Sequence, residues 1–459
     1  MKTKHIVAAL LTSAVGLAFA SAVAAQNVDS LLNKLVDKGI LTTDEATELR
    51  EQNDKDFNKD FNKAYASKTG LPEWVTALKW SGDFRGRFEG FYGENDDFTT
   101  RNRWRYRARL GVTAVMLDNF EAGIRLGSGD IDNAASITSG VDPLSQNQSL
   151  QNNGSKKGIF IDLAYGKWTS VNNADWYGAI TIGKMESPYV FTDIMFDGDY
   201  TPEGAAIQLN RTLSDHHKLL FNAGIFVLDE SGSSEDDPYM TGAQLLLNSS
   251  WTRKLSTSLG VGWMTICNPG ELGSTTVPNI NAGNTRYEVV SGSRTNYLLT
   301  YDFYPVIVDG WLTYKLDKAP FYAGAFPIKI GGEYIYNCGA SSGADNYGYQ
   351  VGIVFGKAGK KRTWELAYTY KWLGANAWYE ELVDSDFGAF YEASQPAMGV
   401  GSGYASGTNV KGHIVRLSYS PYDMLTLSAK AMFTELIDAV PSGSESGMTR
   451  LQVDAMLKF

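Results

Sequence analysis

The sequence predicts an all-β fold, a transmembrane antiparallel β-barrel of about sixteen strands that follows a short N-terminal periplasmic helical segment. Three observations predict it. The chain starts with an export signal, polar and apolar residues alternate from Leu78 to the C-terminus, and tight turns alternate with long polar loops. Only an exported chain that crosses a membrane with strands is expected to combine all three.

The N-terminus is expected to be a signal peptide over residues 1–25. Lys2 and Lys4 precede an apolar run over 6–20 and a small-residue stretch over 21–25, which is the pattern of a secretory signal. A retained anchor is the alternative, but the run is shorter than the roughly 20 residues that a membrane-spanning helix needs. Cleavage would leave 39 basic and 51 acidic residues, a net charge of −12 that disfavours nucleic acid as a partner.

Residues 26–75 are polar and have helical spacing. Leu31, Leu35 and Val36 fall on one helical face, and Gly39 can end that helix. We expect a periplasmic helical hairpin or a short oligomerising coil, with a plain linker as the alternative. The barrel is then expected to occupy residues 76–459.

Five arginines form the strongest alternating pattern, because every second residue from Arg101 to Arg109 is arginine. Trp104 and Tyr106 lie between them, and Leu110 continues the alternation after Arg109. In a strand the arginines share one face and the apolar side chains share the other. The arginine face must meet water, which fits either the wet side of a soluble sheet or the inner wall of a barrel. On a lipid face each arginine would cost about 2–4 kcal/mol, so a barrel would turn them inward.

The connections between strands indicate a barrel rather than a soluble sandwich. Tight turns are expected near 117–119, 172–175, 214–217, 359–361 and 420–423, and long loops near 129–157, 187–203, 230–238, 268–292 and 379–410. Short turns on one rim and long loops on the other are typical of outer-membrane barrels. The segment from Tyr297 to Leu316 is the least regular, because Pro305 and Gly310 interrupt it.

Five stretches carry a family resemblance, namely FRGRF at 84–88 with the arginine run, GKMESP at 183–188, FDGDYTPEG at 196–204, GEYIYN at 332–337 and LLNKLVDKGIL at 31–41. They resemble the bacterial putative porin family of outer-membrane β-barrel porins. The resemblance implies a diffusion channel in the outer membrane of a Gram-negative bacterium, with a homotrimer as in general porins. The terminal Phe459 also resembles the signal that barrel assembly machinery recognises in its clients.

The expected pore-lining residues are the arginines of three neighbouring strands, namely Arg85, Arg87, Arg103, Arg105, Arg107, Arg109 and Arg125. Clustered arginines favour the passage of anions, although an alternative is a structural ladder paired with acids. Analogy with general porins suggests that the third long loop folds inward. Its acids Asp197, Asp199 and Glu203 would then face the arginines as constriction-loop candidates, or else lie on an ordinary surface loop.

The predicted function is passive diffusion of small hydrophilic solutes, without catalysis, cofactor or metal. Gly339–Gly343 formally fits the G-x-S-x-G pattern of serine hydrolases, but it lies in a loop between strands and not at a strand-to-helix elbow. Cys267 and Cys338 are available for a disulfide or stay free. The main alternative function is a structural or adhesive outer-membrane barrel that anchors the envelope through its periplasmic segment, without an open channel.

Overall fold

The computed structural model describes most of the chain after residue 69. The described residues are 70–130, 142–230, 232, 235–278, 282–392, 403–439 and 442–459. Contacts divide the chain into two compact units, Met1–Ala77 and Leu78–Phe459. The predicted signal peptide and nearly all of the predicted helical segment lie outside the described residues. No helix in the described part of the chain has the length and apolar character to cross a membrane.

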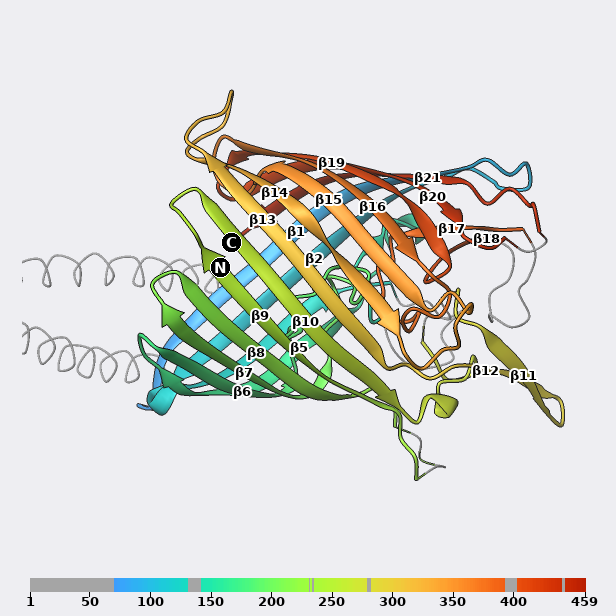
Figure 1. The fold of residues 1–459 in the computed structure, drawn as a ribbon, viewed down its shortest axis with the longest axis horizontal. Coiled ribbons are helices and arrows are strands. Elements are labelled where there is room, and N and C mark those ends of the chain that lie inside the picture. The colour runs from blue at the N-terminus through green and yellow to red at the C-terminus, as the bar shows by residue number, and fades with distance from the viewer. Residues whose placement is uncertain are drawn as a thin grey trace, which may run out of the picture. The chain divides into compact units, whose positions relative to one another are not determined.

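Within the described residues, sixteen long strands form a closed antiparallel barrel, as the alternating pattern predicts (Figure 1). They are β1 (Val75–Gly93), β2 (Arg101–Met116), β3 (Phe120–Ser128), β5 (Ile159–Asn172), β6 (Trp176–Lys184), β7 (Glu203–Ser214), β8 (His217–Val227), β9 (Tyr239–Ser250), β10 (Leu255–Cys267), β13 (Pro305–Leu316), β14 (Phe326–Asn337), β15 (Tyr347–Gly356), β16 (Thr363–Leu373), β19 (Val410–Tyr422), β20 (Leu425–Leu436) and β21 (Met448–Lys458). Each pairs with its neighbour along the chain, and β1 pairs with β21, which closes the ring. In the closing register Arg87 lies opposite Asp454 and Phe91 lies opposite Arg450.

Five short strands lie outside this ring of sixteen or add to it locally. β4 (Gln148–Ser149) pairs with β2 at Arg105 and Tyr106, beyond the point where β3 stops pairing with β2. Two separate hairpins are formed by β11 (Arg286–Ser291) with β12 (Arg294–Leu299) and by β17 (Gly388–Tyr391) with β18 (Gly403–Ser406). The part of the chain that the structure describes also has three single 3-10 turns, η1 (Leu117–Asn119), η2 (Asn152–Gly154) and η3 (Pro269–Glu271).

The irregular segment around Pro305 contains two different elements. Tyr297 belongs to β12, whereas the barrel strand β13 begins at Pro305 itself. Proline is tolerated at the first position of a strand because its missing N–H is not needed for the ladder there. The segment looked irregular in the sequence because it spans the end of one strand, a connection and the start of another.

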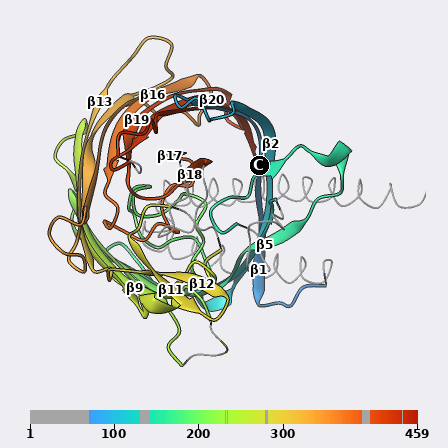
Figure 2. The same cartoon turned by 90° about the vertical axis from the view of Figure 1, so that its right-hand side faces the viewer.

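The two rims differ in loop length, as expected. One rim carries the short connections 117–119, 173–175, 215–216, 251–254, 317–325, 357–362 and 423–424, and the other carries the loops 94–100, 129–158, 185–202, 228–238, 268–304, 338–346, 374–409 and 437–447. We name four of the long loops by their order on this rim: L2 (129–158), L3 (185–202), L5 (268–304) and L7 (374–409). The end-on view shows β17, β18 and neighbouring loop segments within the ring of strands (Figure 2).

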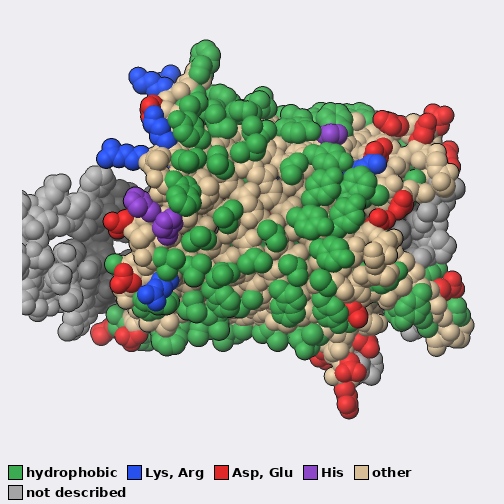
Figure 3. Space-filling view, viewed as in Figure 1, with side chains coloured by type: hydrophobic (Ala, Val, Ile, Leu, Met, Phe, Trp, Pro, Cys, Tyr) green, Lys and Arg blue, Asp and Glu red, His purple; other side chains and the backbone are tan. Residues whose placement is uncertain are grey.

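The side chains of the strands alternate between an apolar outer face and an inner face. On β2 the apolar Trp104 is 63% exposed and Leu110 is 46% exposed, whereas Arg107 between them is only 5% exposed. Hydrophobic side chains cover the middle of the outer surface, while most charged side chains in this view lie towards its two ends (Figure 3). An apolar belt with charged rims is the surface that a bilayer requires of a barrel.

The largest hydrophobic core lies inside the barrel at its long-loop end. It joins Met195 and Phe196 of L3 and Trp378 of L7 to inward-facing strand residues such as Met264 and Ile307. Trp378 is fully buried, and its Nε1 donates to the carbonyl oxygen of Met195 at 2.9 Å. The loops therefore pack against one side of the interior as a folded layer.

Candidate functional site

The arginines of β2 lie in a row on the inner wall. Four of them, Arg103, Arg105, Arg107 and Arg109, each have at least one carboxylate partner. Arg103 donates to Glu89 at 2.5 Å, and Arg105 lies 3.6 Å from the same carboxylate. Arg107 and Arg109 share Asp83, at 3.0 and 2.7 Å. Arg101, at the start of the strand, is exposed and has no ion-pair partner among the described residues. Alternation thus places the five side chains on one face, and neighbouring strands supply the acids.

Glu89 is the centre of this network, because its side chain is fully buried and accepts from several donors. Arg450 Nη2 and Gln452 Nε2, both from β21, donate to its Oε1 at 2.9 Å each. A buried carboxylate is stable only when charges and hydrogen bonds compensate it. The closing pair of strands therefore brings the arginines and their counter-ion together.

Arg87 ties the same wall to L7. It makes two hydrogen bonds to Asp454 of β21, at 2.7 and 2.8 Å, and lies 3.3 Å from Asp386 of L7. Asp386 also accepts from Arg450 at 2.6 Å and from Lys430 of β20 at 3.3 Å.

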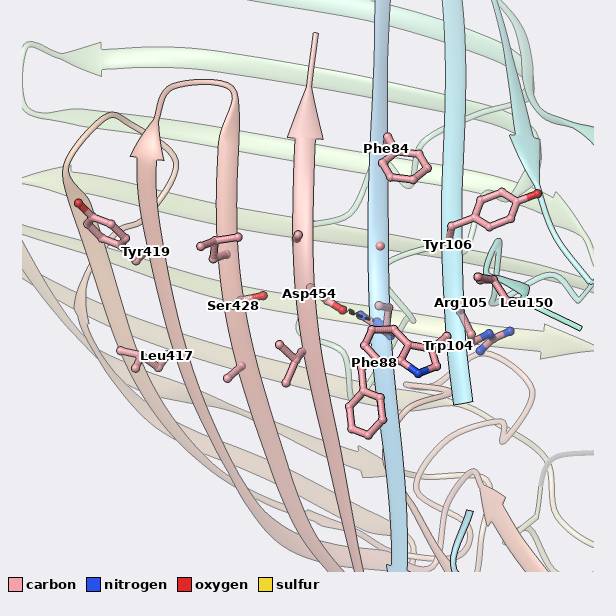
Figure 4. A pocket seen from close by; sticks show the side chains of 16 residues that line it. Phe84, Phe88, Trp104, Arg105, Tyr106, Leu150, Leu417, Tyr419, Ser428 and Asp454 are labelled. Atoms are coloured by element: carbon pink, nitrogen blue, oxygen red, sulfur yellow. Dashed lines mark hydrogen bonds and ion pairs between the residues drawn. The ribbon is translucent and has the colours of Figure 1, made fainter. Parts of the chain in front are cut away.

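On the outer side of this wall, Phe84, Phe88, Trp104 and Tyr106 project from β1 and β2 (Figure 4).

Arg85 differs from its neighbours because no carboxylate pairs with it in the described part of the chain. Its Nη2 donates to the amide oxygen of Asn147 in L2 at 2.6 Å, and its Nε has no partner there. The side chain is 8% exposed. Arg85 is therefore a nearly buried cation that a neutral side chain holds in place.

Arg125 on β3 stands apart from this cluster. Its guanidinium contacts Asp162 of β5 and Glu186 of L3. The structure thus brings Arg85, Arg87, Arg103, Arg105, Arg107 and Arg109 together on adjoining strands, and places Arg125 in a separate ion-pair group.

The three acids of the third long loop have three different environments. Asp199 lies 2.7 Å from Arg107 and 3.5 Å from Arg109, so this part of L3 reaches the arginine wall. Asp197 instead accepts from the backbone N–H and hydroxyl of Ser385 in L7, both at 2.8 Å. Glu203 begins β7, is 64% exposed and pairs with Lys184 at 3.0 Å. Only Asp199 of the three contacts an arginine of the wall.

Burial and neighbouring carboxylates set the ionisation of the L3 and L7 acids. Desolvation, followed by the charge of Asp384, raises the pKa of Asp197 to about 8. Burial opposes ionisation of Asp384 as well, but Lys371 and Lys430 hold the pKa of that carboxyl below its ordinary value. Lys371 Nζ lies 2.9 Å from Asp384 and 2.7 Å from Asp193, so it joins L7 to L3.

L5 secures L7 through a buried ion pair. Arg286 of β11 donates twice to Glu380, at 2.9 and 2.7 Å, and each side chain is 1% exposed. Arg286 also donates to the carbonyl oxygens of Leu272 and Tyr297, so its donors are satisfied locally. The fixed L5–L7 contact holds the inward part of L7 against one side of the interior.

The sequence pattern identified the arginines but missed L7 and much of the counter-charge. Asp386 lies in a loop without a periodic signal, and nothing near it in sequence indicates that it faces Arg87 and Arg450. Arg450, Gln452 and Asp454 alternate along the last strand, so their shared face was predictable, but their pairing across the barrel seam was not.

The two cysteines are not bonded to each other: Cys267 and Cys338 are both free thiols in this structure. Among the described residues, no three His, Cys, Asp or Glu side chains cluster as a metal site would require. His413, on β19, contacts Tyr368 on β16.

The fold and its inner wall define the class: a closed outer-membrane β-barrel of the porin type, with an apolar outer belt and a charged interior. The model of the putative porin family matches residues 94–268, from the first long loop to the start of L5. This match confirms the resemblance seen in the sequence, and it places the protein in the outer membrane of a Gram-negative bacterium.

Solved structures similar to this chain include OprB of Pseudomonas putida in its high-pH structure, with 9% identity, 86% of this chain and 97% of that chain covered, and a TM-score of 0.47. The outer membrane channel DcaP of Acinetobacter baumannii has 13% identity, 83% and 97% coverage and a TM-score of 0.42. A loop-deletion mutant of OmpT from Vibrio cholerae has 11% identity, 83% and 99% coverage and a TM-score of 0.43. No curated protein sequence matches the chain.

Proposed function

We propose that this porin is a water-filled diffusion channel for small hydrophilic solutes and that it prefers anions. The observation that carries the proposal is the excess of cations over carboxylates on the inner wall of β1, β2, β20 and β21. The cations are Arg85, Arg87, Arg101, Arg103, Arg105, Arg107, Arg109, Lys430 and Arg450, and the carboxylates that contact them are Asp83, Glu89, Asp130, Asp199, Asp386 and Asp454.

The carboxylates of the wall neutralise some of its arginines and not others, and this supports anion passage. Arg85 has no carboxylate partner and Arg101 has none, while Arg103 uses only its Nε on Glu89. Uncompensated arginines in a pore wall raise the local concentration of anions, because a low-dielectric wall focuses their field. The paired arginines fix the wall, and the unpaired ones give it a net positive charge.

The inward loops support a narrowed pore rather than a wide one. L3 reaches Arg107 and Arg109 through Asp199, and L7 reaches Arg87 and Arg450 through Asp386. The passage is then bounded by the arginine wall on one side and by L3 and L7 on the other. This geometry favours selection by size and charge over chemical conversion of the solute.

The proposal extends to assembly. The C-terminal strand β21 ends at Lys458, and the backbone N–H of the following Phe459 donates to the carbonyl oxygen of Gly82 at 3.0 Å. We include recognition of this strand by the barrel assembly machinery. We also include a homotrimer in the outer-membrane lipid, which chemical cross-linking in membranes would test.

The direct test is single-channel recording of the purified protein in planar bilayers. We expect a large, steady conductance. A correctly folded protein without conductance would overturn the channel and favour a structural barrel that anchors the envelope.

A double variant tests whether the arginine wall sets the preference for anions. Replacing Arg105 and Arg107 by serine should weaken the preference for anions, because it removes two cations beside Glu89 and Asp83. Arg416→Ser is the control, since Arg416 pairs with Glu365 on β16 and not with Glu89 or Asp83. Loss of the folded barrel in the double variant alone would instead indicate that the ladder is mainly structural.

A further inference from the structure

A polar cavity of about 540 Å³ lies beside the arginine wall at its long-loop end. Arg101, Arg103 and Arg105 of β2 line one side, L2 and L7 line others, and the rings of Phe98 and Tyr404 contribute to the lining. A volume of this size suits a small organic molecule rather than a single ion. It is therefore a candidate binding site and not only a section of an aqueous path.

Some hydrogen-bonding groups that line the cavity already have partners, whereas others do not. Its three carboxylates all have partners: Asp130 accepts from the N–H and hydroxyl of Ser149 at 2.9 and 2.7 Å, and Asp142 accepts from the backbone N–H of Leu144 at 2.9 Å. Asp386 accepts from Arg87, Arg450 and Lys430. Arg103, in contrast, uses its Nε on Glu89, and its two terminal nitrogens have no partner among the described residues. Arg101, two residues earlier on the same face, has no ion-pair or hydrogen-bond partner in the described part of the chain. The cavity thus offers spare donors.

Arg103 is held in a fixed orientation. Its Nε bond to the buried Glu89 sets one edge of the guanidinium, and the group lies 5.1 Å from the ring centre of Phe91. Arg450 lies 4.8 Å from the same ring, and Tyr404 meets it edge-on at 5.1 Å between ring centres. A guanidinium that is already ordered loses less entropy when it binds a carboxylate with two parallel hydrogen bonds.

The aromatic part of the lining gives a second specificity. Phe98 is partly exposed and packs edge-on against Phe390 of β17, with 5.5 Å between ring centres. Tyr404 is also partly exposed, and its hydroxyl donates to the carbonyl oxygen of Asp386 at 2.8 Å. Supported rings of this kind can contact a flat apolar body by stacking or edge contact.

We propose that this cavity is a saturable binding site for small organic carboxylates that carry a flat apolar group. Arg103, with Arg101, receives the carboxylate, and Phe98 and Tyr404 contact the apolar part. The inference rests on the proposed channel function and deepens it, because solutes of this class would pause at a defined site before they pass the narrower wall.

The test is block of the chloride current by benzoate in planar bilayers, with benzoate added on the side of the long loops. We expect a saturable decrease of the wild-type current with benzoate, a much weaker decrease with acetate, and none with benzamide, which has the same ring without the charge. Equal effects of benzoate and benzamide would overturn the proposal.

Variants connect the block to the site. Arg103→Gln should raise the half-blocking benzoate concentration about tenfold or more, because hydrogen bonds to a charged group are lost. Arg416→Gln removes a cation from the lumen outside the cavity and should leave that concentration unchanged. Equal shifts in the two variants would mean that only the overall charge of the lumen matters, and would overturn the site.

Two further measurements test the proposed site if the Arg103 variant does not fold or if the wild type does not conduct. If Arg103→Gln does not fold, Arg101→Gln replaces it, since Arg101 is exposed and has no ion pair among the described residues. If the wild type shows no conductance, the channel proposal fails, and calorimetric titration of the detergent-solubilised protein with benzoate then tests the site alone. Binding that weakens in the variant supports the site, whereas no binding to the wild type overturns it.

Discussion

The two sides of the barrel interior are built on opposite principles. On the wall of β1, β2 and β21 the inward side chains are charged, and Glu89, Arg107 and Arg450 are nearly or fully buried by one another. On the strands from β8 to β14, the inward side chains near the long loops are apolar, such as Met240 and Ile335, and L3, L5 and L7 cover them. One side is held by ion pairs and the other by a hydrophobic core.

The difference shows how a barrel can hold loops inside an otherwise polar interior. Apolar side chains that face a water-filled lumen are costly, so the loops gain stability by covering them. The charged wall packs against L7 through a small apolar cluster of Phe91, Met448 and Phe390, and a water path is expected along the rest of this wall. The acids of L3 and L7 that reach the wall, Asp199 and Asp386, join the two sides.

Glu89→Ala should have the largest effect on stability. It leaves Arg103 and Arg450 without their shared buried carboxylate, and breaking such a pair costs about 3–5 kcal/mol. The measurement is the free energy of unfolding in urea. Glu121→Ala is the control, because its contact with Lys167 is long, at 4.0 Å, and partly exposed. Equal losses in both variants would contradict the central role of the buried carboxylate.

Trp378→Ala should loosen the apolar side. A buried tryptophan replaced by alanine costs about 3–5 kcal/mol, here mainly in the packing of L7 and L3, and the carbonyl of Met195 loses its donor. We expect faster proteolysis within L7 and a higher single-channel conductance, with the barrel intact. Trp251→Ala, at an exposed turn position, should change neither property. Unchanged conductance in the Trp378 variant would show that L7 does not narrow the pore.

Leu259→Arg tests the outer face. Leu259 is 56% exposed on β10, and arginine near the membrane midplane costs about 2–4 kcal/mol on a lipid-facing surface. Ser258→Arg, one residue earlier, points to the opposite face and should cost much less. Unfolding from lipid vesicles measures both. The reverse order would mean that the two faces are wrongly assigned.

Asp197→Asn should flatten the pH dependence of stability. The pKa of Asp197 is raised from 3.8 to about 8, first by burial and then by the charge of Asp384. The folded protein therefore holds a proton that the unfolded chain loses between about pH 4 and 8, so stability falls as the pH rises through this window. The slope for one proton is at most about 1.4 kcal/mol per pH unit. An unaltered pH profile of the melting temperature in the variant would contradict this assignment.

Much of the barrel could be predicted from the sequence, because one alternating face must meet lipid. Arg107 between Tyr106 and Ala108 is a typical case, and the structure turns the arginine inward. Prediction failed where both faces are apolar: Ile307 lies between Val306 and Val308, so its inward position gave no periodic signal. The sequence also could not predict where the side chains of the loops lie. Asp199 and Glu203 are four residues apart, yet only Asp199 contacts the arginines, because β7 begins at Glu203 and carries it away.

We propose that the arginine wall gives an open pore its preference for anions, and the reversal potential under a potassium chloride gradient measures that preference. We expect the wild-type potential to have the sign of chloride selectivity, and Arg85→Gln to move it towards zero, because Arg85 has no compensating carboxylate among the described residues. Arg211→Gln is the control, since Arg211 is exposed against Trp176. A cation-selective wild type, or a selectivity that Arg85→Gln leaves unchanged, would contradict the account.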